Sequence, residues 1–153
     1  KKAFFSTTYG GETIGLASTK KTIEIMKEKK VHRHIWKVGK KLKEGANQRI
    51  KENGLEEHYN WKGFPVWTDI QTTSDKFGSE NEKKGILQQE AMKRGLLAGL
   101  FHGPSYAHKL KDIEKGLDIY DASLKTIKKY YQAGNIKKHI LGSYGGKVFR
   151  QVG

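Results

Sequence analysis

The sequence predicts an α+β fold in which a small antiparallel sheet of about three strands is covered on one face by helices. Several long segments carry apolar residues every three or four positions, a pattern typical of amphipathic helices. Between residues 55 and 71 the pattern changes to aromatic and β-branched residues around the turn-like segment NWKG at 60–63, which favours a hairpin. At 153 residues the chain is long enough for one domain with a core.

The helical pattern predicts four helices. The second of these follows a stripe from Val31 to Ile50 and is expected to stop at Asn53-Gly54, because glycine commonly ends a helix. The fourth is expected to cover the sheet, although its heptad spacing would also suit a coiled coil. The predicted ranges are 14–30, 31 to the stop at 53–54, 85–94 and 110–131. The inward positions predicted for the first are Ile14, Ala17, Ile23 and Met26.

The strands are expected at 55–59, 64–70 and 96–101, with the turn at 60–63 between the first two. The polar segment 72–84 is predicted to be a loop, and residues 134–153 an extended tail with few periodic apolar positions.

The chain is strongly basic, with 30 Lys+Arg against 16 Asp+Glu and a net charge of +14. Nucleic-acid readers favour the bidentate fork of arginine, and only four of these residues are arginine. A solvated lysine-rich surface is therefore favoured over a nucleic-acid face. The alternative is a stand-alone basic module that binds nucleic acid by stacking bases on exposed aromatic rings. The rings considered for it are Trp61, Trp67, Tyr130 and Tyr131.

The chain has no cysteine, which excludes disulfides and thiolate chemistry and favours the cytoplasm as its compartment. No apolar run approaches the roughly 20 residues that cross a bilayer, so no membrane contact is predicted. His102 and His108 flank one loop, but no third metal ligand is evident beside them, and a structural role is favoured. No metal site and no catalytic residue is assigned.

The segment TTYGGET at 7–13 has three features of an anion site. Its threonine hydroxyls can donate to phosphate oxygens, its glycines let backbone amides turn toward an anion, and a helix is predicted to begin directly after it. A strand running into a tight turn would explain the same residues without a ligand. The second glycine-rich segment, GSYGGK at 142–147, lacks the spacing and the Ser or Thr of a phosphate loop.

Four segments together resemble one family. AFFSTTYGGETIGLAS and EKKVHRHIWKVGKKLKEGANQRIKENGL resemble the C-terminal part of class III aminotransferases that depend on pyridoxal phosphate. RGLLAGLFHGPSYAHKLKDIEKGLDIYDASL and the closing GKVFRQVG are similar to the branch that contains glutamate-1-semialdehyde aminomutase. The resemblance covers nearly the whole chain.

The resemblance implies the C-terminal small domain of a fold type I pyridoxal-phosphate enzyme. Residues 1–15 would be a lead-in strand and loop from the large domain, 16–133 the small domain and 134–153 the tail. In the family this loop crosses a homodimer interface, so the resemblance implies that Thr8, with Thr7 beside it, contacts the cofactor phosphate held mainly by the other subunit. The substrate would be a small amino acid, amino sugar or semialdehyde.

The resemblance also implies that the Schiff-base lysine lies upstream of Lys1, so the chain alone is expected to be an inactive fragment. Two positions depart from the family. Glu12-Thr13 stands where the aminomutase tends to have Asn-Pro, which favours a related aminotransferase. Lys109 stands where the family often has a threonine that caps the last helix, and Ser105 or Asp112 is expected to compensate.

Overall fold

The computed structural model describes residues 8, 10–97, 99 and 101–142 of the chain. These fall into two compact units, Lys1–His34 and Ile35–Gly153, which we treat separately. The strand expected at the start of the chain lies outside the described residues.

The first unit contains α1 (Thr13–Glu28), which confirms the helix predicted over 14–30. No residue of α1 is buried, and Ile14 is 78% exposed. The inward positions predicted for this helix are therefore wrong for Ile14, Ala17 and Ile23, which are exposed, and Met26 is only half-buried, because the described part of the unit offers α1 no apolar surface to pack on.

Helix α2 (Val31–Glu52) ends where the sequence predicts, since Gly54 adopts a left-handed φ of 68° that a side chain would disfavour. Its buried positions Val38, Ala46 and Ile50 lie on one stripe. The Asn47 side chain pairs with the backbone of Trp61, accepting from its N–H at 2.8 Å and donating to its carbonyl at 3.0 Å. The Asn47 amide thus satisfies the backbone N–H and carbonyl of one residue at the edge of the sheet. Unpaired groups at such an edge could otherwise pair with a strand of another chain.

The sheet has the predicted three antiparallel strands, in the order β1-β2-β3. They are β1 (Tyr59–Phe64), β2 (Trp67–Thr72) and β3 (Phe101–His102). The predicted positions of the first two strands are wrong, because β1 begins four residues and β2 three residues later than predicted. NWKG lies inside β1, residues 55–58 form a turn closed by the His58 N–H on the Leu55 carbonyl, and the hairpin turns at Pro65-Val66. Proline has no N–H to donate to a ladder, so it sits between the strands. The third strand is much shorter than the predicted 96–101.

Helix α3 (Glu80–Lys93) begins five residues before the predicted Gly85. The cause is a capping box in which the Glu82 carboxylate accepts from the Ser79 N–H at 2.7 Å and the Glu82 N–H donates to the Ser79 hydroxyl at 3.3 Å. The stop predicted at Gly95 is confirmed by its φ of 84°.

Helix α4 (Leu110–Gln132) confirms the fourth predicted helix and its stripe. Lys109 makes no side-chain cap, and Asp112 compensates only in part: its carboxylate accepts from the Lys109 N–H at 2.8 Å, whereas no side chain in the described ranges caps the first-turn amides of α4. The buried residues of this stripe are Ile113, Leu117, Tyr120, Leu124, Ile127 and Tyr131.

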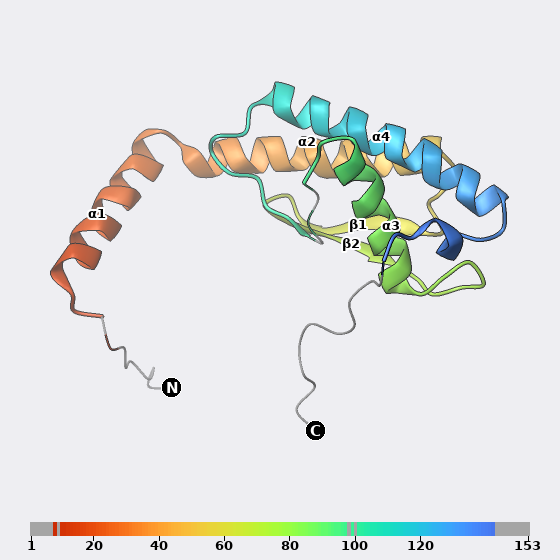
Figure 1. Cartoon of the computed structure of the whole chain (residues 1–153). Helices are drawn as coiled ribbons and strands as arrows, with labels where there is room; N and C mark the ends of the chain where they lie inside the picture. The colour runs from red at the N-terminus through yellow and green to blue at the C-terminus, as the bar shows by residue number, and fades with distance from the viewer. Residues whose placement is uncertain (1–7, 9, 98, 100, 143–153) are drawn as a thin grey trace, which may run out of the picture. The chain divides into compact units, whose positions relative to one another are not determined.

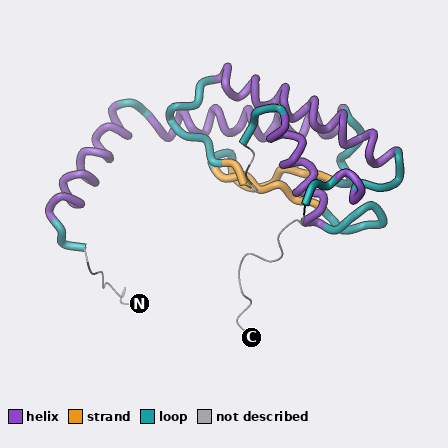
Figure 2. Tube along the Cα trace, viewed as in Figure 1, coloured by secondary structure: helices purple, strands orange, loops and turns teal. Residues whose placement is uncertain are grey.

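The helices of the second unit cover one face of the sheet, as predicted. Figures 1 and 2 show α2 and α4 running together over the strands, and alternate strand residues such as Tyr59, Trp61 and Ile70 are buried beneath them. Within the described part of the predicted tail, residues 134–142, the chain is not simply extended. Lys137–His139 form a 3-10 turn and Ile136 is fully buried in the core.

None of the helices in the described ranges combines the length and the apolar character needed to cross a membrane.

Candidate functional site

The loop that precedes α1 presents Thr8 to solvent. Thr8 lies at an exposed bend, and Gly10 and Gly11 form an exposed turn after it. A Cβ added to Gly11 would meet no other atom within 4 Å, so the space beside this turn is open. Thr7 lies outside the described residues.

The first amides of α1 are already paired with a carboxylate. The two oxygens of Glu12 accept from the Ile14 N–H at 3.0 Å and from the Gly15 N–H at 2.6 Å. Gly15 permits this approach, since a Cβ there would lie 2.7 Å from a Glu12 oxygen. The positive end of the helix field therefore acts on Glu12 in this arrangement.

The exposed Thr8 and the open turn after it leave room for an anion beside this loop, but the Ile14 and Gly15 amides of α1 are occupied by the Glu12 carboxylate. In the sequence Glu12 stands out only as a departure from a family motif, and its capping role was not predicted. An acidic residue at the position before a helix, followed three residues later by glycine, is a signal that could have revealed it.

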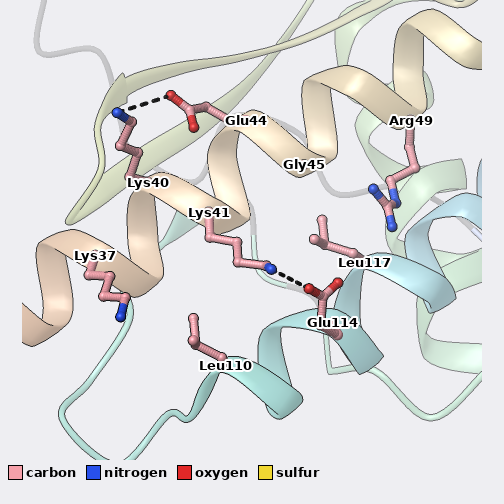
Figure 3. Close-up of a pocket in the computed structure, with 9 residues that line it drawn as sticks. All are labelled: Lys37, Lys40, Lys41, Glu44, Gly45, Arg49, Leu110, Glu114 and Leu117. Atoms are coloured by element: carbon pink, nitrogen blue, oxygen red, sulfur yellow. Dashed lines mark ion pairs between the residues drawn. The ribbon is translucent and has the colours of Figure 1, made fainter.

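A basic groove of about 500 Å³ lies between α2 and α4 (Figure 3). Its cations are largely committed to carboxylates nearby: Lys41 pairs with Glu114 across the two helices, Lys40 lies 3.7 Å from Glu44, and Arg49 lies 3.9 Å from Asp118. The hydrogen bond from Lys41 also holds the pKa of Glu114 below its usual range. These ion pairs explain the charged residues of the groove as contacts within and between two packed helices, without a ligand.

The two histidines singled out in the sequence make structural contacts. His102 is hydrogen-bonded through Nε2 to the Tyr120 hydroxyl, and burial lowers its pKa to about 4. His108 accepts from the Ser105 N–H at 2.9 Å, at the start of α4. Among the residues that the structure describes, no group of three or more His, Cys, Asp or Glu side chains could hold a metal ion.

A buried lysine was missed because its segment was expected to be a loop and because lysine is rarely buried without a partner. Lys83 is fully buried, and its Nζ donates to Asp75 Oδ2 and to the Thr73 carbonyl, each at 2.6 Å. Burial alone would raise the pKa of Asp75, but the hydrogen bonds from Lys83 and from the Phe77 N–H outweigh it and lower the pKa. The pair fastens the loop before α3 to the core.

The stacking surface expected for a nucleic-acid module is largely absent. Trp61 and Tyr131 are buried in the core, and Tyr130 is half-buried and stacks on His139 at 3.8 Å between ring centroids. Of the four rings considered, Trp67 is the largely exposed one. The alternation of β1 explains the error for Trp61, because it directs Tyr59 and Trp61 toward the helices.

No protein-family model and no curated protein matches the sequence. The structure is similar to the pyridoxal-phosphate internal aldimine form of the FumI protein of Sphingopyxis sp. MTA144, with a TM-score of 0.68 and 15% identity over 92% of this chain and 33% of that one. It is also similar to an omega-transaminase from Sphaerobacter thermophilus, with a TM-score of 0.52 and 18% identity over 61% of this chain and 23% of that one. The chain thus spans about a third of the FumI protein, and its α+β fold is that of a small part of such enzymes.

Proposed function

We propose that this chain is the C-terminal part of a pyridoxal-phosphate-dependent aminotransferase and that its Thr8 loop contacts the cofactor phosphate across a homodimer interface. The main support is the fold likeness to the FumI protein, which extends over 92% of the chain. The exposure of Thr8 adds to it, because a half-site that meets its ligand on another subunit must be accessible from outside.

Within this proposal Thr8 donates its hydroxyl hydrogen to a phosphate oxygen, and the open turn at Gly10-Gly11 lets the backbone approach the same group. The bound cofactor would supply the electron sink for amino-group chemistry. The residues of this loop bind and orient its phosphate.

The remaining parts of the proposal follow the resemblance. Residues 1–15 belong with the large domain, 16–133 form the small domain and 134–153 the tail; the lysine that holds the cofactor is supplied by another part of the enzyme. The substrate is a small amino acid, amino sugar or semialdehyde. The SYAH segment at 105–108 supports the aminomutase-like branch, whereas Glu12-Thr13 supports an aminotransferase within it.

The test is the cofactor affinity of the full-length enzyme with Thr8 changed. Thr8→Ala is expected to weaken pyridoxal-phosphate binding about tenfold or more, because a hydrogen bond to a charged group contributes roughly 1.5–3 kcal/mol. Thr8→Ser keeps the hydroxyl and should retain most of the affinity. Thr19→Ala removes an exposed threonine from α1 and serves as the matched control. Equal cofactor affinities for Thr8→Ala and Thr19→Ala would show that Thr8 does not contact the phosphate.

A further inference from the structure

Three large aromatic side chains form an exposed patch at the β1–β2 turn. Trp36, Phe64 and Trp67 are 46%, 71% and 59% exposed. The rings of Trp36 and Phe64 meet edge to face with centroids 6.3 Å apart, and Phe64 stands opposite Trp67 in the strand register. We call these three residues the aromatic patch. Contiguous apolar surface of this kind is uncommon on a protein that meets only water.

The backbone that carries the patch is held firmly against α2. A Cβ added to Gly39 would lie 1.9 Å from the Pro65 carbonyl oxygen, so the turn packs directly on the helix backbone. Lys43 donates from Nζ to the Gly63 carbonyl at 2.7 Å. A surface fixed in this way loses little conformational entropy when a partner covers it.

Polar pairs border the patch along the same hairpin. Lys62 stands opposite Asp69, and Asn60 stands opposite Gln71. An aromatic centre with a polar border is the usual composition of a protein–protein interface, where Trp and other large aromatic residues contribute most of the binding free energy.

We propose that the aromatic patch docks on the cofactor-binding part of the aminotransferase, an inference that rests on the proposed function. About two thirds of the FumI chain lies outside the 33% that matches, so such an enzyme has ample surface to cover the patch. For the isolated 153-residue chain a second copy is a poor occupant of the patch, because two chains of net charge +14 repel each other. The partner surface is expected to be apolar at its centre and less basic than this chain.

Hydroxyl-radical footprinting tests the docking by comparing the 153-residue chain with the full-length enzyme. Modification of Phe64 and Trp67 should fall at least about fivefold in the enzyme, as burial in an interface predicts. Met92, which is 49% exposed on α3, is the exposed reference, and the buried Trp61 is the protected one. Unchanged modification of Phe64 and Trp67 in the full-length enzyme would overturn the docking.

Cofactor content, measured by absorbance on the same sample, separates two kinds of failure. An unprotected patch in an enzyme that contains pyridoxal phosphate overturns the docking alone. Lack of the cofactor overturns the proposed function and the docking with it.

A charged substitution supplies an independent readout. Phe64→Asp should lower the melting temperature of the full-length enzyme by several degrees more than that of the 153-residue chain, because a charge is then buried only in the enzyme. Met92→Asp, on α3 and outside the aromatic patch, should shift both by similar amounts. Equal shifts for Phe64→Asp in the two proteins would contradict the docking.

Discussion

Glu12 determines what the loop before α1 can do, because its carboxylate holds two amides beside the predicted phosphate contact of Thr8. A negative charge at this place opposes a second anion, while the same charge stabilises the helix end. The proposed site is therefore expected to be weaker than one in which these amides are open.

Replacing Glu12 by Asn tests this competition. Asn still caps a helix well but carries no charge, so Glu12→Asn is expected to tighten pyridoxal-phosphate binding by the full-length enzyme roughly threefold or more while α1 stays formed. Glu24→Gln removes an exposed carboxylate of the same helix that pairs with Lys21 at 3.7 Å, and it should change the affinity little. Weaker binding in Glu12→Asn would show that the carboxylate supports the site.

His102 predicts a dependence of stability on pH. Its imidazole has an ordinary pKa of 6.5 that burial lowers to about 4, so between these values the unfolded chain binds more protons than the folded one. The free energy of unfolding should thus be fully retained above pH 6.5 and fall, by roughly 3 kcal/mol, as the pH drops toward 4. Urea unfolding at several pH values measures the slope, and His102→Gln should flatten it. An NMR titration of the His102 ring with a midpoint above about 6 would contradict the prediction.

At the residue level the sequence predicted contacts that follow from local rules and missed those that depend on burial. Asp112 was expected to act at the start of α4, and its contact with the Lys109 N–H is one half of a capping box, although none of the described side chains caps the first-turn amides. The burial of Lys83 depends on the neighbouring loop bringing Asp75 and the Thr73 carbonyl to its ammonium group, and no local pattern signals that.

Among the elements, long helices were predicted well and short strands were not. Helices α2 and α4 each present a stripe over more than five turns, so one misplaced residue does not alter the interpretation. Strand β1 has six residues, and its aromatic content pointed to the right region with the wrong boundaries. Pro65 is the residue that fixes the turn, because it cannot donate to the ladder.

Glu90 links α3 to α4 through Arg94, and this link predicts a dependence of stability on pH. It accepts from Arg94 Nη1 at 2.8 Å, and Arg94 Nη2 donates to the Thr126 hydroxyl on α4 at 2.6 Å. Burial alone would raise the pKa of Glu90, but the hydrogen bonds from Lys93, Arg94 and Gln89 outweigh it and lower the pKa from 4.5 to about 2.

The contribution of Glu90 to the free energy of unfolding should be fully present above pH 4.5 and be lost as the pH falls toward 2. The reason is that the carboxylate of the unfolded chain is protonated at a higher pH than that of the folded chain. Glu90→Gln should lower the free energy of unfolding at pH 7 by on the order of 2 kcal/mol and reduce its slope between these pH values. Glu44→Gln, at an exposed pair on α2, is the matched control. A slope equal to that of the original chain in Glu90→Gln would exclude this role.

For the whole molecule the fold class was predictable, because the sequence of helical and strand patterns admits few layered arrangements. The burial of Ile136 was not, since Ile136 and Ile140 are too few apolar positions to establish a period. The fate of the aromatic rings also depended on packing: Trp61 and Tyr131 entered the core while Phe64 and Trp67 stayed exposed.

The net charge of +14 is expected to give only generic attraction to nucleic acid, because the groove between α2 and α4 pairs most of its cations internally. Two of the four expected stacking rings are also buried, and a third is half-buried. Fluorescence anisotropy with a single-stranded oligonucleotide should show binding weaker than about 1 µM near 150 mM salt, lost steeply as salt rises. Tighter binding that persists at about 200 mM salt would support the stand-alone basic module instead.

The central claim is that this chain works as part of a larger pyridoxal-phosphate enzyme. The most direct test is to isolate the native polypeptide from source cells with an antibody raised against the chain and to measure its size and its bound cofactor. We expect a polypeptide well above 17.4 kDa whose absorbance shows bound pyridoxal phosphate. A native polypeptide of 17.4 kDa without the cofactor would contradict the account and favour the basic module.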